Sequence, residues 1–146
     1  KIDFAIFAFP YELPDYIESF QVFADPIYFI QHKSRKSKEI DNGSLLMLEQ
    51  GHCLRSHILQ NNEISSKHIS NFSCTSISTL VAMVDTNIGV SFLPRMAIDF
   101  GILSHYPNIN IDLESTKAKR DIGVIYRKNN PQEDNIKKLA ALLKMV

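Results

Sequence analysis

The chain has 146 residues, of which 45% are hydrophobic, and its 16 Lys and Arg side chains balance 16 Asp and Glu side chains. This composition is that of an ordinary globular protein with one domain or two small lobes, and the zero formal net charge argues against direct nucleic-acid binding by this segment. No apolar run reaches membrane-spanning length, and the only two cysteines, Cys53 and Cys74, are too few for a disulfide scaffold and fit a reducing cytoplasm.

The N-terminal half predicts a series of short buried strands. The opening segment KIDFAIFAF, residues 1–9, is apolar and aromatic and is soon followed by two prolines, as expected for a buried strand. Residues 20–30 predict two strands separated by a turn or bulge at Asp25-Pro26. The polar, basic residues 33–43 predict a surface loop or a short helix, and the apolar run 45–48 predicts another buried strand.

The rest of the chain alternates between helix and strand signals. A glycine at position 51 followed by helical spacing of apolar residues predicts a tight turn and then a helix. The last helix is predicted to be capped by Asn130, with Pro131 in its first turn. Further strands are predicted at 69–74, 90–93, 109–113 and 122–126, and further helices at 77–84 and 96–100. This alternation predicts an α/β fold with a mixed or largely parallel sheet.

Cys53 is the first candidate for chemistry. It falls in the first turn of a predicted helix, where free backbone N–H groups and the positive end of the helix dipole meet. His52, Arg55 and His57 add positive charge nearby in the sequence, and all of these effects favour a thiolate. A thiolate is the form that peroxides oxidise, first to a sulfenic acid. A small buried cysteine without redox function would fit the same spacing.

Thr75 and Ser76 form a second candidate site, at the start of the helix predicted from residue 77. Their hydroxyls and the free N–H groups of a helix start can hold an anion or a small polar ligand, although the same residues are also ordinary helix caps. No metal or other cofactor is expected, because no partner completes a zinc-ligand set with the histidines that flank Cys53. Enzyme activity is not expected either, since the chain has no nucleophile-elbow motif and no glycine-rich phosphate loop.

Four segments carry a resemblance to a known family. SLLMLEQGHCLR, residues 44–55, resembles the strand-to-helix segment of the OxyR regulators around their peroxide-reactive cysteine, and OxyR regulators are LysR-type transcriptional regulators. TSISTLVAMV, GVSFLPRMAID and KRDIGVIYRKNNP, at residues 75–84, 89–99 and 119–131, resemble further segments of LysR effector domains in the family order and with family-like spacing. Together these segments identify the chain as similar to a LysR effector domain.

The resemblance implies a two-lobed α/β fold of the periplasmic-binding-protein-like type 2 class, with an incomplete first lobe. Residues 1–15 and 123–146 would form the partial first lobe, and residues 16–122 would form the second lobe, which carries the reactive cysteine. The effector would bind in the cleft between the lobes. DNA would be bound only through an N-terminal domain that this sequence lacks, and the missing part of the first lobe would leave strand edges that favour self-association.

The resemblance also implies roles for single residues. Cys53 matches the peroxide-reactive cysteine, and His52 and Arg55 match flanking residues that position the peroxide or stabilise the thiolate. Arg120 matches a basic residue near the same pocket, while Thr75 and Ser76 match the helix start that lines the interlobe cleft. The regulator is expected to be a cytoplasmic activator whose effector domain forms homodimers and whose full-length form is a homotetramer.

One feature departs from the OxyR pattern. The place of the second cysteine, with which the reactive cysteine forms a disulfide in the family, holds Asn61-Asn62. Three interpretations stay open: Cys53 stops at a sulfenic acid or a mixed disulfide, it pairs with Cys74 if their Cα atoms lie within about 7 Å, or the disulfide switch is lost.

Two alternatives to peroxide sensing remain. A LysR effector domain could bind a small metabolite or anion at Thr75, Ser76 and Arg120, without redox chemistry at Cys53. An enzyme or a transport-type binding protein could be built on the same fold, since fold does not fix function. The sequence shows neither a catalytic motif nor a secretion signal, which argues against an enzyme and against a transport-type binding protein.

Overall fold

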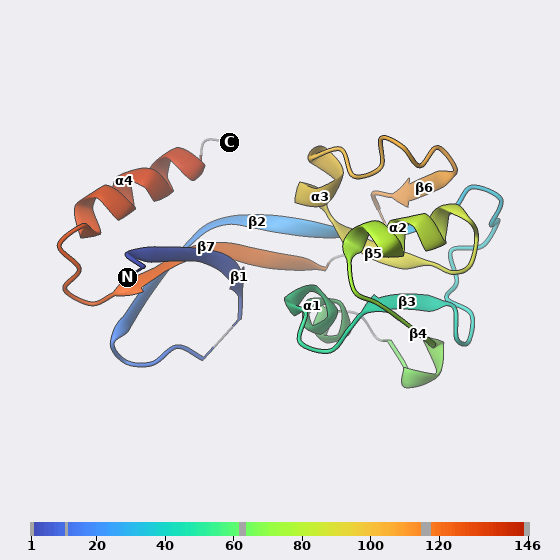
Figure 1. Ribbon diagram of the computed structural model, residues 1–146, viewed down its shortest axis with the longest axis horizontal. Helices are drawn as coiled ribbons and strands as arrows, with labels where there is room; N and C mark the ends of the chain where they lie inside the picture. The colour runs from blue at the N-terminus through green and yellow to red at the C-terminus, as the bar shows by residue number, and fades with distance from the viewer. Residues whose placement is uncertain (1, 11, 62–63, 115–117, 145–146) are drawn as a thin grey trace. The chain divides into compact units, whose positions relative to one another are not determined.

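The computed structural model describes residues 2–10, 12–61, 64–114 and 118–144. Within them, five strands form one sheet with the order β1-β7-β2-β5, in which β6 also pairs with β2, and β3 and β4 form a two-stranded sheet (Figure 1). The strands are β1 (Phe4–Phe9), β2 (Ile17–His32), β3 (Leu45–Leu48), β4 (Ile69–Cys74), β5 (Ser91–Pro94), β6 (Ile109–Asp112) and β7 (Lys119–Arg127). The helices are α1 (Cys53–Asn61), the short 3-10 helix η1 (Ser66–His68), α2 (Ile77–Asp85), α3 (Arg95–Asp99) and α4 (Glu133–Leu143). None of the described helices is both long and apolar enough to span a membrane.

The chain divides into two compact units. Unit 1 comprises Lys1–Asp25 and Arg120–Val146, and unit 2 comprises Pro26–Lys119. The strands β2 and β7 contribute to both units. The lobe limits implied by the family resemblance, after residues 15 and 122, stay a prediction.

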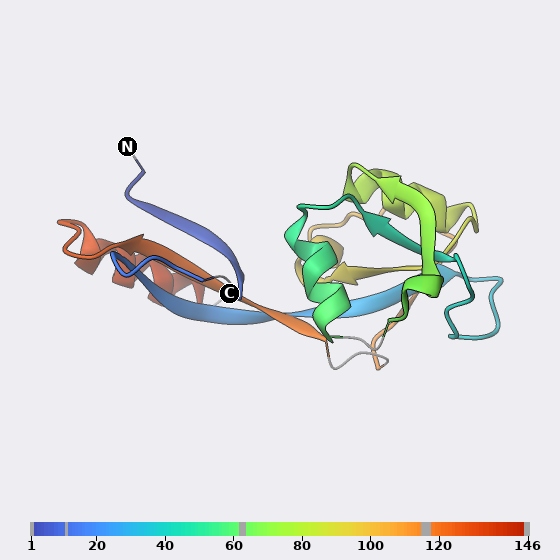
Figure 2. The ribbon, with the colours of Figure 1, turned by 90° about the horizontal axis from the view of Figure 1, so that it is seen from below.

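Unit 1 is a small antiparallel layer covered by one helix. β1 pairs with β7 from Phe4↔Tyr126 to Phe9↔Asp121, and α4 lies along one face of the layer (Figures 1 and 2). Gly123 is required where these strands meet, because a Cβ there would overlap the Phe9 ring and lie 2.6 Å from the backbone oxygen of Phe20. The buried core consists of Val22, Val124, Tyr126, Ile136 and Ala140.

Unit 2 holds the larger core and both candidate sites. The second half of β2 pairs antiparallel with β5 and β6, whereas β3 and β4 are parallel and Leu45 bridges to Val90 in the parallel sense. Among the pairings described, β1–β7, β2–β5 and β2–β6 are antiparallel, so the expectation of a largely parallel sheet is wrong. Parallel pairing occurs in the separate β3–β4 sheet and at the Leu45–Val90 bridge. Because β3 and β4 run in the same direction, the segments that follow them, one leading to Cys53 and the other to Ser76, leave from the same edge.

Two local predictions were wrong. β2 runs unbroken from Ile17 to His32, so Asp25-Pro26 is not a turn between two strands. Pro26 is tolerated because its fixed φ suits an extended chain and because it lies just before Ile27, where pairing with β5 begins. The last helix begins at Glu133 after an N-cap at Gln132, and Asn130 instead caps the preceding turn, its Oδ1 accepting from the Gln132 N–H at 2.9 Å.

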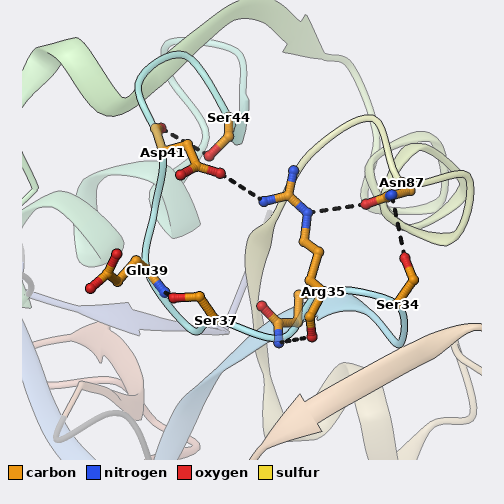
Figure 3. Close-up of polar contacts among 8 residues, drawn as sticks. Ser34, Arg35, Ser37, Glu39, Asp41, Ser44 and Asn87 are labelled. Atoms are coloured by element: carbon orange, nitrogen blue, oxygen red, sulfur yellow. Dashed lines mark hydrogen bonds and ion pairs between the residues drawn. The ribbon is translucent and has the colours of Figure 1, made fainter.

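Arg35 lies at the centre of a group of polar contacts in the loop of residues 33–43 (Figure 3). Arg35 donates from Nε to Asn87 Oδ1 at 3.0 Å and from Nη1 to Asp41 Oδ2 at 3.3 Å. Asn87 also donates to Ser34 Oγ at 3.4 Å, and Ser44 Oγ donates to the Asp41 carbonyl at 2.9 Å. These contacts join the loop to the turn after α2 and to the start of β3. The basic loop is therefore held as a structural connection in unit 2.

Candidate functional site

Cys53 is the first residue of α1. Between it and Leu48, the last residue of β3, lie the four exposed residues Glu49–His52, which we call the Cys53 turn. Gly51 within this turn has φ +95°, a backbone conformation that side-chain-bearing residues rarely adopt. Cys53 itself is half-buried, at the edge of the helix face that Leu54 and Ile58 bury in the core. The predicted sequence of buried strand, glycine turn and helix start is present at these residues.

The Cys53 turn is fixed by backbone hydrogen bonds. The Glu49 N–H donates to the Cys74 carbonyl at 3.1 Å, and the His52 N–H donates to the Glu49 carbonyl at 3.3 Å. Arg55 extends these contacts, because its Nη1 donates to the Leu48 carbonyl at 2.9 Å. Arg55 thus contacts the end of β3, while the role inferred from the resemblance, beside the thiolate, stays a prediction.

The histidines near Cys53 lie in different environments. His52 is exposed in the Cys53 turn, whereas His57 is buried, with 3% of its surface exposed. His57 stands one helical turn after Cys53, and side chains spaced by four residues are neighbours on a helix surface. The sequence analysis considered His57 as a nearby charge and as a possible metal ligand, whereas its burial depends on how α1 packs in the core.

Cys74 is a core residue. It ends β4, is only 1% exposed, and its Sγ lies 3.5 Å from Met83 Sδ of α2. Burial raises the pKa of the Cys74 thiol, so the thiolate is disfavoured at neutral pH. Both cysteines are free thiols in this structure. The pairing of Cys53 with Cys74 stays an open prediction.

Thr75 and Ser76 precede α2 and are exposed. Ser76 is the N-cap of α2, and its Oγ accepts from the Thr79 N–H at 3.1 Å and lies 3.0 Å from Thr79 Oγ1. Its capping role is therefore present, whereas the ligand-binding role of both residues is untested. Since β3 and β4 are parallel neighbours that end at Leu48↔Cys74, the Cys53 turn and this helix start share one edge of unit 2.

Arg120 belongs to unit 1, whereas Cys53, Thr75 and Ser76 belong to unit 2. The Arg120 guanidinium is engaged by Asp25, with Nε–Oδ2 and Nη2–Oδ2 distances of 2.9 Å and 2.8 Å. Asp25 was not predicted as a partner, since it lies 95 residues away in the sequence. Among the residues that the structure describes, no group of three or more His, Cys, Asp or Glu side chains is placed to hold a metal ion.

Comparison with known proteins matches the whole chain to one family. The family model for the LysR substrate binding domain covers residues 1–146. The HTH-type transcriptional regulator EstR of Acinetobacter baylyi is 26% identical over 154 aligned residues, which cover 100% of this chain and 51% of that protein. The DNA-binding transcriptional dual regulator OxyR of Escherichia coli is 31% identical over 106 residues, which cover 68% of this chain and 33% of that protein.

Solved structures give the same result at the level of the fold. The reduced form of the regulatory domain of OxyR2 from Vibrio vulnificus superposes with a TM-score of 0.88 at 30% identity, covering 99% of this chain and 71% of that one. The chain spans about half the length, or less, of the curated relatives it matches. The expected fold class, the periplasmic-binding-protein-like type 2 fold of LysR effector domains, is confirmed. The chain belongs to the LysR substrate-binding domain family and is an OxyR-like regulatory domain.

Proposed function

We propose that this regulatory domain senses hydrogen peroxide through oxidation of Cys53. The observation that carries the proposal is the contrast between the two thiols: Cys53 is half-buried at the start of α1, whereas Cys74 is enclosed in the core. A relative from Haemophilus influenzae, 29% identical over 113 residues, bears the name hydrogen peroxide-inducible genes activator, which supports the same chemistry.

The reaction that we propose is a two-electron oxidation of the sulfur. The Cys53 thiolate attacks one oxygen of hydrogen peroxide, an S–O bond forms and the O–O bond breaks. The sulfur becomes a sulfenic acid, and the departing hydroxide takes up a proton and leaves as water. The attacking sulfur belongs to the first residue of α1, which has nine residues, where the helix N–H groups have no intrahelical partner. His52 and Arg120 remain proposed supporting residues.

The fate of the sulfenic acid is a separate part of the proposal. Asn61-Asn62 hold the place of the family's second cysteine; Asn62 lies outside the described residues, and Asn has no thiol to condense with. Because Cys74 is packed against Met83, we propose that Cys53 stays a sulfenic acid or forms a mixed disulfide with an external thiol, rather than a bond to Cys74. A DNA-binding part in a longer chain, homodimers of this domain and a full-length homotetramer belong to the same proposal.

Mass spectrometry after peroxide treatment tests the proposal. The folded chain is exposed to a small molar excess of hydrogen peroxide, digested, and analysed for oxygen added at each cysteine. We expect Cys53 to be oxidised much faster than free cysteine, and Cys74→Ala to be oxidised at Cys53 equally fast. Cys53 oxidation no faster than that of free cysteine would exclude peroxide sensing by this domain. Slow formation of a Cys53–Cys74 disulfide would contradict only the proposed fate.

A second candidate function is the binding of a small metabolite or anion at the start of α2. The specific observation in its favour is the exposed Thr75 hydroxyl beside the Ser76 cap, at the helix end that attracts anions. The regulatory domain of an OxyR2 variant from Vibrio vulnificus, 31% identical to this chain, has been solved in a sulfate-bound form. Calorimetric titration with sulfate tests this function, and Thr75→Val should abolish any heat that arises from the site.

A further inference from the structure

The position of Cys53 depends on a segment with little packing of its own. All four residues of the Cys53 turn are exposed, so no apolar anchor holds them. The cysteine that follows is half-buried, which means that small shifts of the turn change how far its sulfur reaches the surface. Because a reacting sulfur must approach peroxide in a defined geometry, whatever fixes this turn also fixes the reactivity of Cys53.

Hydrogen bonds at both ends close the Cys53 turn. At the β3 end, the Glu49 N–H is bound to the Cys74 carbonyl at 3.1 Å. At the α1 end, the Arg55 N–H donates to the His52 carbonyl at 3.1 Å. The Arg55 side chain then returns to the beginning of the loop, since its Nη1 donates to the Leu48 carbonyl at 2.9 Å. This last contact, which we call the Arg55 tie, joins the two ends of the turn across Cys53.

The direction of Arg55 argues against direct contact with the sulfur. On an α-helix, side chains two residues apart do not face each other, and Arg55 follows Cys53 by two positions. The guanidinium is directed instead to the buried end of β3, where Leu48 is 3% exposed. Its contribution to Cys53 therefore passes through the backbone.

We propose that Arg55 is a positioning residue for the peroxide reaction, which acts by holding the Cys53 turn against the Leu48 carbonyl and not by contacting the thiolate. This inference rests on the proposed function and gives Arg55 a role different from the one that the family resemblance implies. It assigns the effect to the donor geometry of the guanidinium, which Lys does not reproduce.

Arg55→Met tests the proposal, because Met keeps an unbranched side chain and removes every donor. We expect the rate of Cys53 oxidation by hydrogen peroxide to fall roughly tenfold to a hundredfold, the size of effect that a misplaced reacting group produces. The pH midpoint for alkylation of Cys53 by iodoacetamide should stay at the wild-type value, because Arg55 is proposed to act through the Leu48 carbonyl and not by contact with the sulfur. Arg55→Lys should recover only part of the rate. Arg95→Met, which removes an exposed arginine of α3, is the matched control and should keep the full rate.

Each outcome decides between the alternatives. All rates are measured well below the thermal midpoint of each variant. In Arg55→Met, hydrogen exchange of the backbone amides at positions 52 and 55 should become faster, while the amides of α2 stay protected. A reactive wild type with an unaltered Arg55→Met rate overturns this inference and leaves the proposed function standing. A raised alkylation midpoint in Arg55→Met, with full recovery by Lys, overturns it in favour of a direct charge effect. An unreactive wild type overturns the proposed function itself.

Discussion

Arg120 and Asp25 form an ion pair in which two guanidinium nitrogens share one carboxylate oxygen, at 2.9 Å and 2.8 Å. The Asp25 side chain is 1% exposed and that of Arg120 is 15% exposed. Asp25 ends the first chain segment of unit 1 and Arg120 begins the second, so the pair joins the neighbouring strands β2 and β7. Any effector that uses Arg120 therefore has to displace Asp25 or share the guanidinium with it.

Breaking this pair should destabilise unit 1. We expect Arg120→Met to cost about 3 kcal/mol, because the Asp25 carboxylate is left buried without its cation. Hydrogen exchange of the amides that join β1 and β7 measures the opening free energy of this unit. Lys128→Met is the control at the residue that follows β7, since the Lys128–Glu18 pair is exposed and spans 4.0 Å, and it should cost less than about 1 kcal/mol. Equal exchange rates in both variants would show that the Arg120–Asp25 pair stabilises unit 1 no more than the exposed Lys128–Glu18 pair does.

The two thiols should differ sharply toward alkylation. In the folded chain we expect iodoacetamide to label Cys53 and to leave Cys74 unmodified until urea is added, because Cys74 is packed against Met83. The measurement is the alkylated fraction of each cysteine-containing peptide by mass spectrometry. Labelling of Cys74 at the same rate as Cys53 would show that the end of β4 opens readily, and would favour a Cys53–Cys74 bond after oxidation.

The raised pKa of Cys74 also predicts a pH dependence of stability. Burial holds the proton on the folded-state thiol, so its contribution to stability is complete below the unfolded-state value of about 8.5 and is lost as the pH rises toward the folded-state value. We expect the urea midpoint of wild type to fall above that pH more steeply than the midpoint of Cys74→Ala. If the urea midpoints of wild type and Cys74→Ala fell equally steeply with pH, the raised pKa of Cys74 would not contribute to the pH dependence of stability.

Elements with strong local signals could be predicted from the sequence. The run 45–48, the glycine at 51 and the spacing after Cys53 specify strand, turn and helix without long-range information, and Ser76 caps α2 by a contact three residues away. Pro26 misled the prediction for β2, because a proline is compatible with a strand where the partner strand changes, and only the tertiary pairing shows where that is.

The polar contacts that organise the candidate site are mostly non-local. The Glu49–Cys74 bond and the Asp25–Arg120 pair join residues far apart in sequence, and no composition or spacing rule relates them. The Arg55 tie is local, yet the sequence shows only a basic residue near Cys53 and not where its side chain points. Sequence thus indicated which residues to consider, and packing decided what each of them contacts.

Tyr126 should titrate above free tyrosine and respond to Glu133. Burial raises the pKa of the Tyr126 phenol, and the Glu133 carboxylate, which accepts its hydrogen bond at 3.3 Å, raises it further. We expect Glu133→Gln to lower the Tyr126 pKa while leaving it above the ordinary value of about 10. Titration of the Tyr126 ring signals by NMR measures this. Because the pKa of Tyr126 is raised in the folded state, the stability that the phenol contributes should be lost as the pH rises above about 10. An identical titration of Tyr126 in wild type and in Glu133→Gln would exclude the Glu133 contribution.

Asn87 should be needed both for its backbone conformation and for its side chain. It has φ +61°, and its amide binds Arg35 and Ser34 (Figure 3). We expect Asn87→Gly to lose only the side-chain bonds, at about 1 kcal/mol, and Asn87→Ala to lose a further 1 kcal/mol or so, because Ala tolerates a left-handed conformation poorly. Thermal unfolding followed by circular dichroism gives both values. Asn129, at φ +60°, is the other non-glycine residue with positive φ among the described residues, so its Gly and Ala variants isolate the backbone effect. If Asn87→Gly were as stable as wild type, the Arg35–Asn87 bond would not contribute to fixing the loop of residues 33–43.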